Sequence, residues 1–308
     1  MTSDRDHVTD SATIIVTAAD CNYFRFAQDL IRSVLAQAGP TVTLGFLDLG
    51  LAADQRTWLV SRGVCVRPPH SPLHPVSPDE AALGKMGYLA RPFLRENFPG
   101  YETYVWLDAD TWLQDRSALD ALIAGARTTG AAMVRQDERA YRFWLWQVCW
   151  IHKHSVLGYG ALRGMWLASR PMINNGVFAL MVNAPHWERW HRHYDSALGR
   201  TGLAVPHDQF GLNAAVYFDR LPTAFLPATA NWICDLATPM WNDDLGKLCV
   251  PYLPFDPISI IHLAGPAKRN TFDVCRTRGG SIRRALRYGA SEMPGKAPSA
   301  RSETTVNE

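Results

Sequence analysis

Short apolar runs alternate with amphipathic segments along the first part of the chain. Three runs have the length and composition of buried strands: Thr13–Thr17, Thr41–Leu47 and Val64–Val66. Two segments between them have helical periodicity: Tyr23–Gln37, which stops at Gly39-Pro40, and Gln55–Ser61. This alternation of strand and helix predicts a parallel sheet with helices on both faces.

The same kind of pattern continues to about residue 268. Further strands are predicted at Tyr104–Leu107, Ala131–Arg135, within Met172–Val182, and at Ser259–Leu263. Further helices are predicted at Leu83–Asn97, Trp187–Leu198 and Leu212–Phe218, and residues 68–79, rich in Pro and His, predict a loop. Beyond Lys268 the chain becomes basic and then rich in Gly, Pro and Ser. We therefore expect a disordered lead at 1–11, one α/β domain at 12–270, and a basic C-terminal helix with a disordered tail at 271–308.

Composition and charge narrow the function classes. The net charge of +2 over 308 residues is too small to indicate a nucleic-acid partner. From Lys268 onward, nine Lys and Arg against four Asp and Glu give a local net charge of +5. The six cysteines show no zinc spacing and are widely scattered, which favours a reduced, cytoplasmic protein. We expect no signal peptide, because the first residues are polar, and no membrane span, because no apolar run reaches roughly 18 residues.

One apolar strand ends in two carboxylates, Asp108 and Asp110. In an extended backbone this spacing places both side chains on one face. Two unpaired acids at the end of a buried strand repel each other and are costly to desolvate, and a divalent cation removes both problems. Oxygen ligands without a nearby cysteine favour Mg²⁺ or Mn²⁺ over zinc. The pair therefore predicts a metal site that could hold a diphosphate; the alternative is a solvated loop in which Asp110 caps a helix.

A polar turn follows the first strand and contains Asp20, Asn22 and Tyr23. The first two could pair with the edge of a base, and the tyrosine could stack on its face. The alternative is a helix cap with a partly buried tyrosine.

Three later motifs carry polar side chains next to predicted elements. Asn174 precedes Gly176, whose missing side chain allows close backbone approach. Asp208 and Gln209 could hydrogen-bond a sugar, or Asp208 could simply cap a helix. After the last strand, His262 could be a third metal ligand and Lys268 a counter-charge for a diphosphate, although each residue type is more often structural or solvated.

The order of these motifs resembles the retaining glycosyltransferases of family 8, a group that includes bacterial lipopolysaccharide galactosyltransferases and glycogenin. The matching pattern is AAD-x-NY, D-x-D, N-x-G-V, DQ-x-x-LN and H-x-x-G-x-x-K, and it spans about residues 13–268. The resemblance implies a GT-A fold: a single α/β domain with a mixed, mostly parallel sheet and helices on both faces. The D-x-D and the last motif are its most specific parts.

The resemblance also implies a role for each matching residue. Uridine would contact Asp20, Asn22 and Tyr23, with Ala18, Arg91 and Ala109 as further donor contacts. The metal, Mn²⁺ or Mg²⁺, would be held by Asp108, Asp110 and His262. The sugar would contact Asn174, Asp208 and Gln209, of which Asp208 and Gln209 are the catalytic candidates, and the diphosphate would contact Gly265 and Lys268.

The implied reaction moves a hexosyl group from a UDP-sugar to a saccharide or glycolipid, with retention at the anomeric carbon. Since no carboxylate is clearly placed as a nucleophile, we prefer front-face attack with Gln209 in an orienting role, and a covalent route through Asp208 stays open. Phe210, Arg269 and Asn270 depart from the family pattern, so the donor sugar and the acceptor are open.

Two segments fall outside the family pattern. Trp144, Trp146, Trp150 and Trp166 would either line an acceptor site or pack a helix onto the sheet. The basic segment with Arg276, Arg278, Arg283, Arg284 and Arg287 would either hold the protein to the inner face of an anionic membrane or form a solvated helix face.

Three other function classes share parts of this pattern. A haloacid-type phosphatase also has D-x-D at a strand end, but it requires Thr or Val where this chain has Trp112. A sugar-nucleotide pyrophosphorylase begins with a Gly-rich basic loop that residues 17–23 lack. A non-catalytic nucleotide-sugar-binding protein is the remaining alternative.

Overall fold

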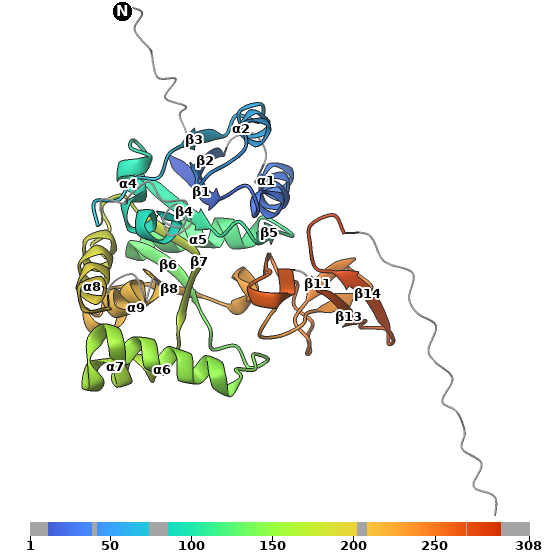
Figure 1. Ribbon diagram of the computed structural model, residues 1–308. Coiled ribbons are helices and arrows are strands. Elements are labelled where there is room, and N and C mark those ends of the chain that lie inside the picture. The colour runs from blue at the N-terminus through green and yellow to red at the C-terminus, as the bar shows by residue number, and fades with distance from the viewer. Residues whose placement is uncertain (1–11, 39–41, 74–85, 202–207, 269, 291–308) are drawn as a thin grey trace, which may run out of the picture.

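The computed structural model describes residues 12–38, 42–73, 86–201, 208–268 and 270–290. Its centre is a seven-stranded sheet with the strand order β3-β2-β1-β4-β7-β6-β8, and helices cover both faces (Figure 1). The strands are β1 Thr13–Ala19, β2 Thr43–Asp48, β3 Cys65–Arg67, β4 Thr103–Leu107, β6 Ala131–Arg135, β7 Ile173–Met181 and β8 Ala224–Leu226. Every strand predicted before residue 182 is present, with bounds that differ by at most two residues; the predicted start at Thr41 lies outside the described residues.

Four helices lie close to the positions predicted at Tyr23–Gln37, Gln55–Ser61, Trp187–Leu198 and Leu212–Phe218, whereas the three helices between residues 117 and 168 are not among those predicted. They are α1 Phe24–Ala38, α2 Ala53–Val60, α4 Leu94–Asn97, α5 Ser117–Thr129, α6 Leu145–Tyr159, α7 Ala161–Ala168, α8 His186–Thr201 and α9 Asp208–Phe218. The helix predicted at Leu83–Asn97 begins outside the described residues, and from residue 86 it is divided into a helical stretch at 86–90, a 3₁₀ turn η1 at Arg91–Phe93, and α4. Pro92, inside η1, removes a backbone donor, which explains the break.

The sheet is mixed rather than wholly parallel. Strands β1, β2, β3 and β4 pair in parallel, as do β6 and β8, whereas β7 runs antiparallel to both β4 and β6. Strand–helix alternation alone predicts only parallel pairs. It misses the reversal at β7, because strand direction is not encoded in hydrophobic periodicity.

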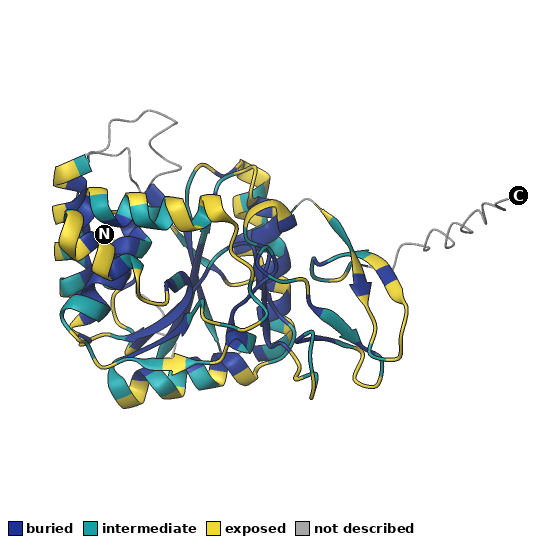
Figure 2. Ribbon diagram, turned by 90° about the horizontal axis from the view of Figure 1, so that it is seen from below, coloured by how far each residue is buried: buried dark blue, intermediate teal, exposed yellow. Residues whose placement is uncertain are grey.

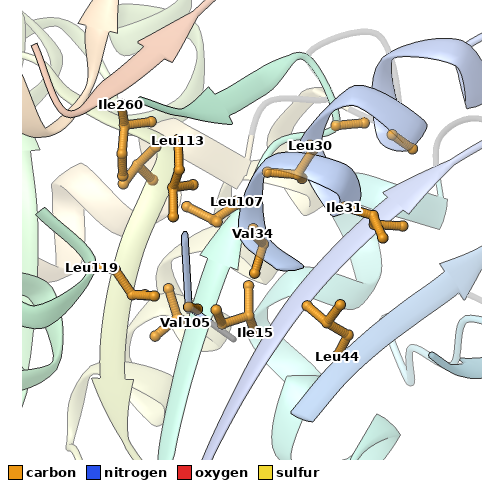
Figure 3. Close-up of a cluster of buried hydrophobic side chains, with 14 of the residues drawn as sticks. Ile15, Leu30, Ile31, Val34, Leu44, Val105, Leu107, Leu113, Leu119 and Ile260 are labelled. Carbon is orange, nitrogen blue, oxygen red and sulfur yellow. The ribbon is translucent and has the colours of Figure 1, made fainter. Parts of the chain in front are cut away.

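Alternate residues of the central strands enter two different cores. On β4, Val105 packs toward α1 and α5, whereas Tyr104 and Trp106 pack toward α8 and α9. Figure 3 shows the first core, where Leu30 and Val34 of α1 approach the sheet. Figure 2 shows the buried strands between helices whose outer sides are exposed. Each fully buried large apolar side chain contributes about 1.5–3 kcal/mol, so these two cores fix the position of β4 and of the acidic turn after it.

Smaller sheets extend the molecule beside the main one. One consists of β5 Thr111–Leu113, β12 Ile260–His262 and β9 Trp232–Ile233, in the order β5-β12-β9. Two hairpins follow: β10 Met240–Asn242 with β11 Lys247–Cys249, and β13 Thr271–Cys275 with β14 Ser281–Ala285. Short 3₁₀ turns lie at η3 Ala228–Ala230 and η4 Gly265–Lys268.

The helix predicted after residue 270 is wrong, because residues 271–285 form the β13–β14 hairpin. Gly279 and Gly280 both have positive φ, at 93° and 76°, and such a glycine pair is a strong hairpin signal. Val274, Ile282 and Leu286 bury their side chains in a core with Trp112. Where the GT-A domain ends along the chain stays a prediction, and the predicted lead at 1–11 and the tail at 291–308 lie outside the described residues.

The arginines of the predicted basic segment already have acidic partners. Four of the five form ion pairs with aspartates: Arg276 with Asp243, Arg278 with Asp244, Arg283 with Asp273, and Arg287 with Asp29. Their charge is therefore partly offset within the protein. Within the described ranges, no helix combines the length and the apolar character that a membrane crossing requires.

Candidate active site

Asp108 and Asp110 lie in a tight turn between β4 and β5. The backbone N–H of Thr111 donates to the carbonyl of Asp108 at 2.9 Å, and the Thr111 hydroxyl donates to the same oxygen at 2.8 Å. The two carboxylates therefore converge because the chain folds back on itself. The two side chains come together as predicted. The predicted cause, an extended backbone, is wrong, because residues 108–110 form a turn.

His262 reaches this turn through the pairing of β12 with β5. The register places His262 opposite Thr111, and its Nε2 lies 3.4 Å from Asp110 Oδ1 and 3.9 Å from Asp108 Oδ2. One ligand atom from each of the three residues lies within 4.8 Å of the other two. Two carboxylates and an imidazole form a donor set for a divalent cation.

A chain of hydrogen bonds orients the imidazole of His262. The backbone N–H of Gly176 donates to Asn174 Oδ1 at 2.9 Å, so this side-chain atom is the oxygen. Asn231 Nδ2 donates to the same oxygen at 2.9 Å, which leaves Asn231 Oδ1 facing His262 Nδ1 at 2.9 Å. His262 must then donate from Nδ1, which leaves Nε2 as the ring nitrogen that faces the two aspartates and that can ligate a metal when it carries no proton. These three residues therefore fit a metal ion, with Asn231 as the group that orients the imidazole.

Gly176 is required at this position by space. Strand β7 has a register irregularity opposite β6 here, and the Gly176 carbonyl accepts the backbone N–H of Asp108 at 2.7 Å. A Cβ atom at Gly176 would lie 2.5 Å from His262 Cε1 and 2.7 Å from Asp108 Oδ2. The glycine of the N-x-G-V motif thus lets β7 approach the metal-binding group.

Lys268 supplies positive charge beside the aspartates. Its Nζ lies 2.8 Å from Asp110 Oδ2. Burial alone would raise the pKa of Asp110, but His262 and Lys268 hold that pKa well below its ordinary value. Burial would likewise lower the pKa of Lys268, but Asp110 raises it. Asp110 is therefore ionised and Lys268 charged at neutral pH.

A cavity of about 260 Å³ opens next to this group. Eight of the predicted donor-binding and metal-binding residues line it: Ala18, Asp20, Tyr23, Arg91, Asp108, Ala109, Asp110 and Lys268. Leu49, Gly87, Tyr88 and Trp106 line it as well and were not predicted. Tyr88 precedes Arg91 by three residues, a spacing that places both on one side of a helical turn, so the sequence did contain a signal for it.

The turn after β1 combines two of the expected roles. Asp20 Oδ1 accepts the backbone N–H of Tyr23 at 2.8 Å, which is the helix-cap alternative, and Asp20 also lines the cavity. Tyr23 is 40 % exposed, and Lys268 Nζ lies 3.5 Å from its hydroxyl and 5.2 Å from the centre of its ring. Asn22 is exposed and lies outside the cavity lining.

Arg91 connects the acidic turn to the start of α9. The guanidinium is buried between Asp108 Oδ1 and Asp208 Oδ2, each at 3.4 Å, and it lies over the ring of Trp106. The Trp106 indole N–H donates to Asp108 Oδ1 at 2.8 Å. Burial raises the pKa of Asp208 to about 7, even though Arg91 acts to lower it. Asp208 therefore contacts Arg91 rather than the cavity.

The remaining predicted residues lie around the cavity and outside its lining. Gln209 is partly exposed in the first turn of α9, where its carbonyl accepts the Asn213 amide at 2.8 Å. Gly265 has a φ of 60°, and a Cβ there would lie 3.0 Å from the Asp235 carboxylate. Asp235 and Asn231 were not singled out by the sequence, because neither belongs to a motif.

Comparison with known proteins gives similarity at the level of structure. No family model matches the sequence, and no curated protein matches it. The apo structure of WbbM, a bifunctional glycosyltransferase, is 19 % identical with a TM-score of 0.50, and the match covers 84 % of this chain and 46 % of WbbM. This chain thus spans just under half the length of WbbM.

Two further glycosyltransferase structures are similar at lower TM-scores. The galactosyltransferase LgtC, in complex with donor and acceptor sugar analogues, is 15 % identical with a TM-score of 0.48, over 82 % of this chain and 88 % of LgtC. A glycosyltransferase involved in the glycosylation of the major capsid of PBCV-1 is 14 % identical with a TM-score of 0.41, over 82 % and 93 %. With the similarity to WbbM and the mixed seven-stranded sheet, the chain has the GT-A glycosyltransferase fold that its resemblance to family 8 implied.

Proposed function

We propose that this protein is a metal-dependent retaining glycosyltransferase that moves a hexosyl group from a UDP-sugar to a saccharide or glycolipid. The observation that carries the proposal is the convergence of Asp108, Asp110 and His262 at one side of a cavity that also contains Asp20 and Tyr23. A site for a cation beside a site for a base is what a nucleoside diphosphate requires. The GT-A fold of the chain supports this proposal.

In the proposed complex, Asp108, Asp110 and His262 hold Mn²⁺ or Mg²⁺. Such an ion would offset the negative charge that develops on the leaving UDP, a contribution worth several kcal/mol in a site that excludes water. Lys268 adds a fixed positive charge on the same side, and Gly265 allows the backbone to approach the phosphates. Tyr23 stacks on the base, while Asp20 and Asn22 pair with it.

For the chemical step we propose front-face attack by the acceptor hydroxyl on the anomeric carbon, with retention of configuration. The bond from that carbon to UDP would break, and an oxygen of the departing UDP would take the hydroxyl proton. Asp208 is buried, and it contacts Arg91. These contacts favour a positioning role for Asp208, through Arg91 and Asp108, over a role as covalent nucleophile. Gln209 then orients the donor sugar. Asn174 contributes by holding Asn231 and thereby His262, in addition to its predicted sugar contact.

The test is a UDP-release screen across donor sugars with Mn²⁺, using the full chain. The expected result is turnover with one donor, loss of activity in EDTA, and a product whose anomeric configuration matches that of the donor by NMR. Asp110→Asn should lower turnover by about a hundredfold or more, because it removes charge from the metal group.

Asp120→Asn is the matched control, since Asp120 pairs with Arg116 on the outer side of α5 and should leave turnover unchanged. Binding of UDP-sugars without turnover of any donor would instead support the non-catalytic binding protein. Full turnover in Asp110→Asn would contradict the metal assignment.

A further inference from the structure

Helices α6 and α7 expose several large apolar side chains to solvent. Trp144, Leu145 and Trp146 at the start of α6 are 67 %, 77 % and 64 % exposed, and Leu162 on α7 is 89 % exposed. Met165 and Trp166 extend this surface along α7. Single exposed apolar residues are ordinary, but a contiguous group marks a surface that contacts something apolar. We call these six residues the docking face. Figure 1 places α6 and α7 at the outer edge of the molecule, beyond α8 and α9.

The inner side of the same helix pair packs against the protein. Ser155 of α6 is buried against Gly164 of α7, where a Cβ would lie 2.4 Å from the Ser155 carbonyl. The rings of Trp150 on α6 and Phe210 on α9 lie 5.4 Å apart. Of the two interpretations of the Trp-rich segment, packing therefore describes Trp150. The docking face is the outer side of a pair of helices that is already anchored to the protein.

The charged residues of the segment that carries the docking face have one sign. Residues 139–170 contain five Lys and Arg and no Asp or Glu. All five are exposed: Arg139, Arg142, Lys153, Arg163 and Arg170. On α6, Trp146, Lys153 and Leu157 recur at intervals of seven and four residues, so a cation lies on the same side as the apolar side chains.

The combination of exposed apolar and positively charged side chains indicates what kind of partner binds the docking face. A second copy of the chain on a two-fold axis would bring two positive surfaces together, which is unfavourable. Tryptophans beside Lys and Arg on an exposed helical face are typical of segments that lie in the headgroup region of an anionic bilayer. There the indoles reach the acyl boundary, and the cations contact lipid phosphates.

We propose that the docking face of α6 and α7 binds the surface of an anionic lipid bilayer. Arg142 and Trp144 also line a second cavity of about 420 Å³, together with Asp235, Ala267 and Asn270. A bilayer on the docking face would therefore lie beside this cavity. Two other residues of the cavity lining, Ala267 and Asn270, are close to Lys268 in the sequence. This placement differs from the predicted attachment through the basic segment after residue 270, where four arginines are paired with aspartates.

The test is sedimentation of the full chain with phosphatidylcholine vesicles that do or do not contain phosphatidylglycerol. We expect binding only to the vesicles that contain phosphatidylglycerol, and weaker binding as salt rises. Lys153→Glu changes the face by two charges and should lower the partition coefficient about 25-fold, at roughly fivefold per charge. Trp146→Ser combined with Leu162→Ser should lower it about tenfold or more.

Matched controls lie on other surfaces. Val60 on α2 and Leu245 in the β10–β11 turn are 63 % and 54 % exposed, so Val60→Ser with Leu245→Ser removes two exposed apolar side chains outside α6 and α7. Arg127→Glu at the end of α5 changes the charge by two units, as Lys153→Glu does, but outside the docking face. These controls should bind vesicles as the unchanged chain does, and circular dichroism checks that every variant is folded.

Three outcomes would overturn the proposal. One is equal sedimentation of the docking-face variants and the controls. Another is that the chain does not bind vesicles but self-associates in light scattering, and that Trp146→Ser abolishes this self-association. That result would identify a second copy of the chain as the partner of the docking face. The third is binding to polyglutamate but not to vesicles, which would indicate an acidic protein. Since the assay contains no sugar donor, its result is independent of the proposed transferase activity.

Discussion

At the scale of single residues, the site depends on a hydrogen-bond relay whose polarity is set by one backbone amide. The Gly176 N–H identifies the oxygen of Asn174, and this in turn sets Asn231 and the Nδ1 proton of His262. Only the neutral imidazole with its lone pair on Nε2 can ligate a metal together with Asp108 and Asp110. Asn231 is therefore part of the candidate metal site although it contributes no ligand.

Asn231→Ala should weaken Mn²⁺ binding by about 10–100-fold, because the imidazole loses the acceptor that orients it. Titration of Mn²⁺ followed by electron paramagnetic resonance measures the affinity. Asn242→Ala is a control of similar burial, since Asn242 Oδ1 caps a distant turn through the N–H groups of Asp244 and Leu245. An unchanged Mn²⁺ affinity in Asn231→Ala would show that the relay does not support the site.

His186, at the start of α8, couples stability to pH. Burial lowers its pKa to about 4, while the unfolded chain has an ordinary histidine pKa near 6.5. Between these two pH values the unfolded state binds a proton that the native state does not bind. The free energy of unfolding therefore falls as pH falls through this window, by roughly 3 kcal/mol in total from this residue.

In His186→Gln this contribution should disappear. The imidazole Nε2 lies 3.1 Å from the Thr223 hydroxyl, and glutamine retains the capacity to hydrogen-bond there. Urea unfolding of both proteins at several values between pH 7 and 4 provides the comparison. The difference in unfolding free energy between the two should shrink as pH falls, and parallel pH profiles would contradict the prediction.

At the scale of elements, close approach between α6 and α7 is the feature most sensitive to side-chain size. A Cβ at Gly164 would lie 2.4 Å from the Ser155 carbonyl and 2.5 Å from Val156 Cα, both backbone atoms that cannot move aside. By contrast, a Cβ at Gly199 of α8 would meet no atom of the described residues within 4 Å. The two helical glycines therefore form a matched pair.

Gly164→Ala should destabilise the protein by about 1–3 kcal/mol through overpacking, against the small gain from helix propensity. Gly199→Ala should stabilise it by up to about 1 kcal/mol, since only propensity changes there. Both values come from urea unfolding at one pH. Equal stabilisation by the two substitutions would mean that α6 and α7 can separate without cost.

Some secondary-structure elements agree with the sequence pattern and others differ from it. Helical periodicity located α1 and α8 well, because one side of each faces a core. After residue 270 the basic composition predicts a solvated helix whereas Gly279-Gly280 predicts a tight turn, and the structure forms the β13–β14 hairpin. The turn at Asp108–Asp110 was read as extended, since a strand and the turn after it share one apolar run.

At the scale of the whole molecule, the metal site links ligand binding to folding. An ion that binds only the native state stabilises it by about 2.7 kcal/mol when its concentration is a hundred times its dissociation constant. Mn²⁺ should therefore raise the free energy of unfolding in urea by about that amount relative to EDTA. Asp110→Asn should lose most of this gain, and an equal gain in both proteins would place the ion elsewhere.

The sequence by itself determined six strands of the main sheet, the strand that carries His262, the helices α1, α2, α8 and α9, and the acidic pair, because periodicity and strand ends are local properties; the motif order added the GT-A fold class. It also gave the order of the family motifs, from which His262 and Lys268 were selected. Only the tertiary structure decided that β12 pairs with β5 and brings His262 to Asp108, that Asn231 orients it, and that Asp208 contacts Arg91. These contacts join residues far apart in the chain, and they depend on strand register and direction, which a hydrophobic pattern does not encode.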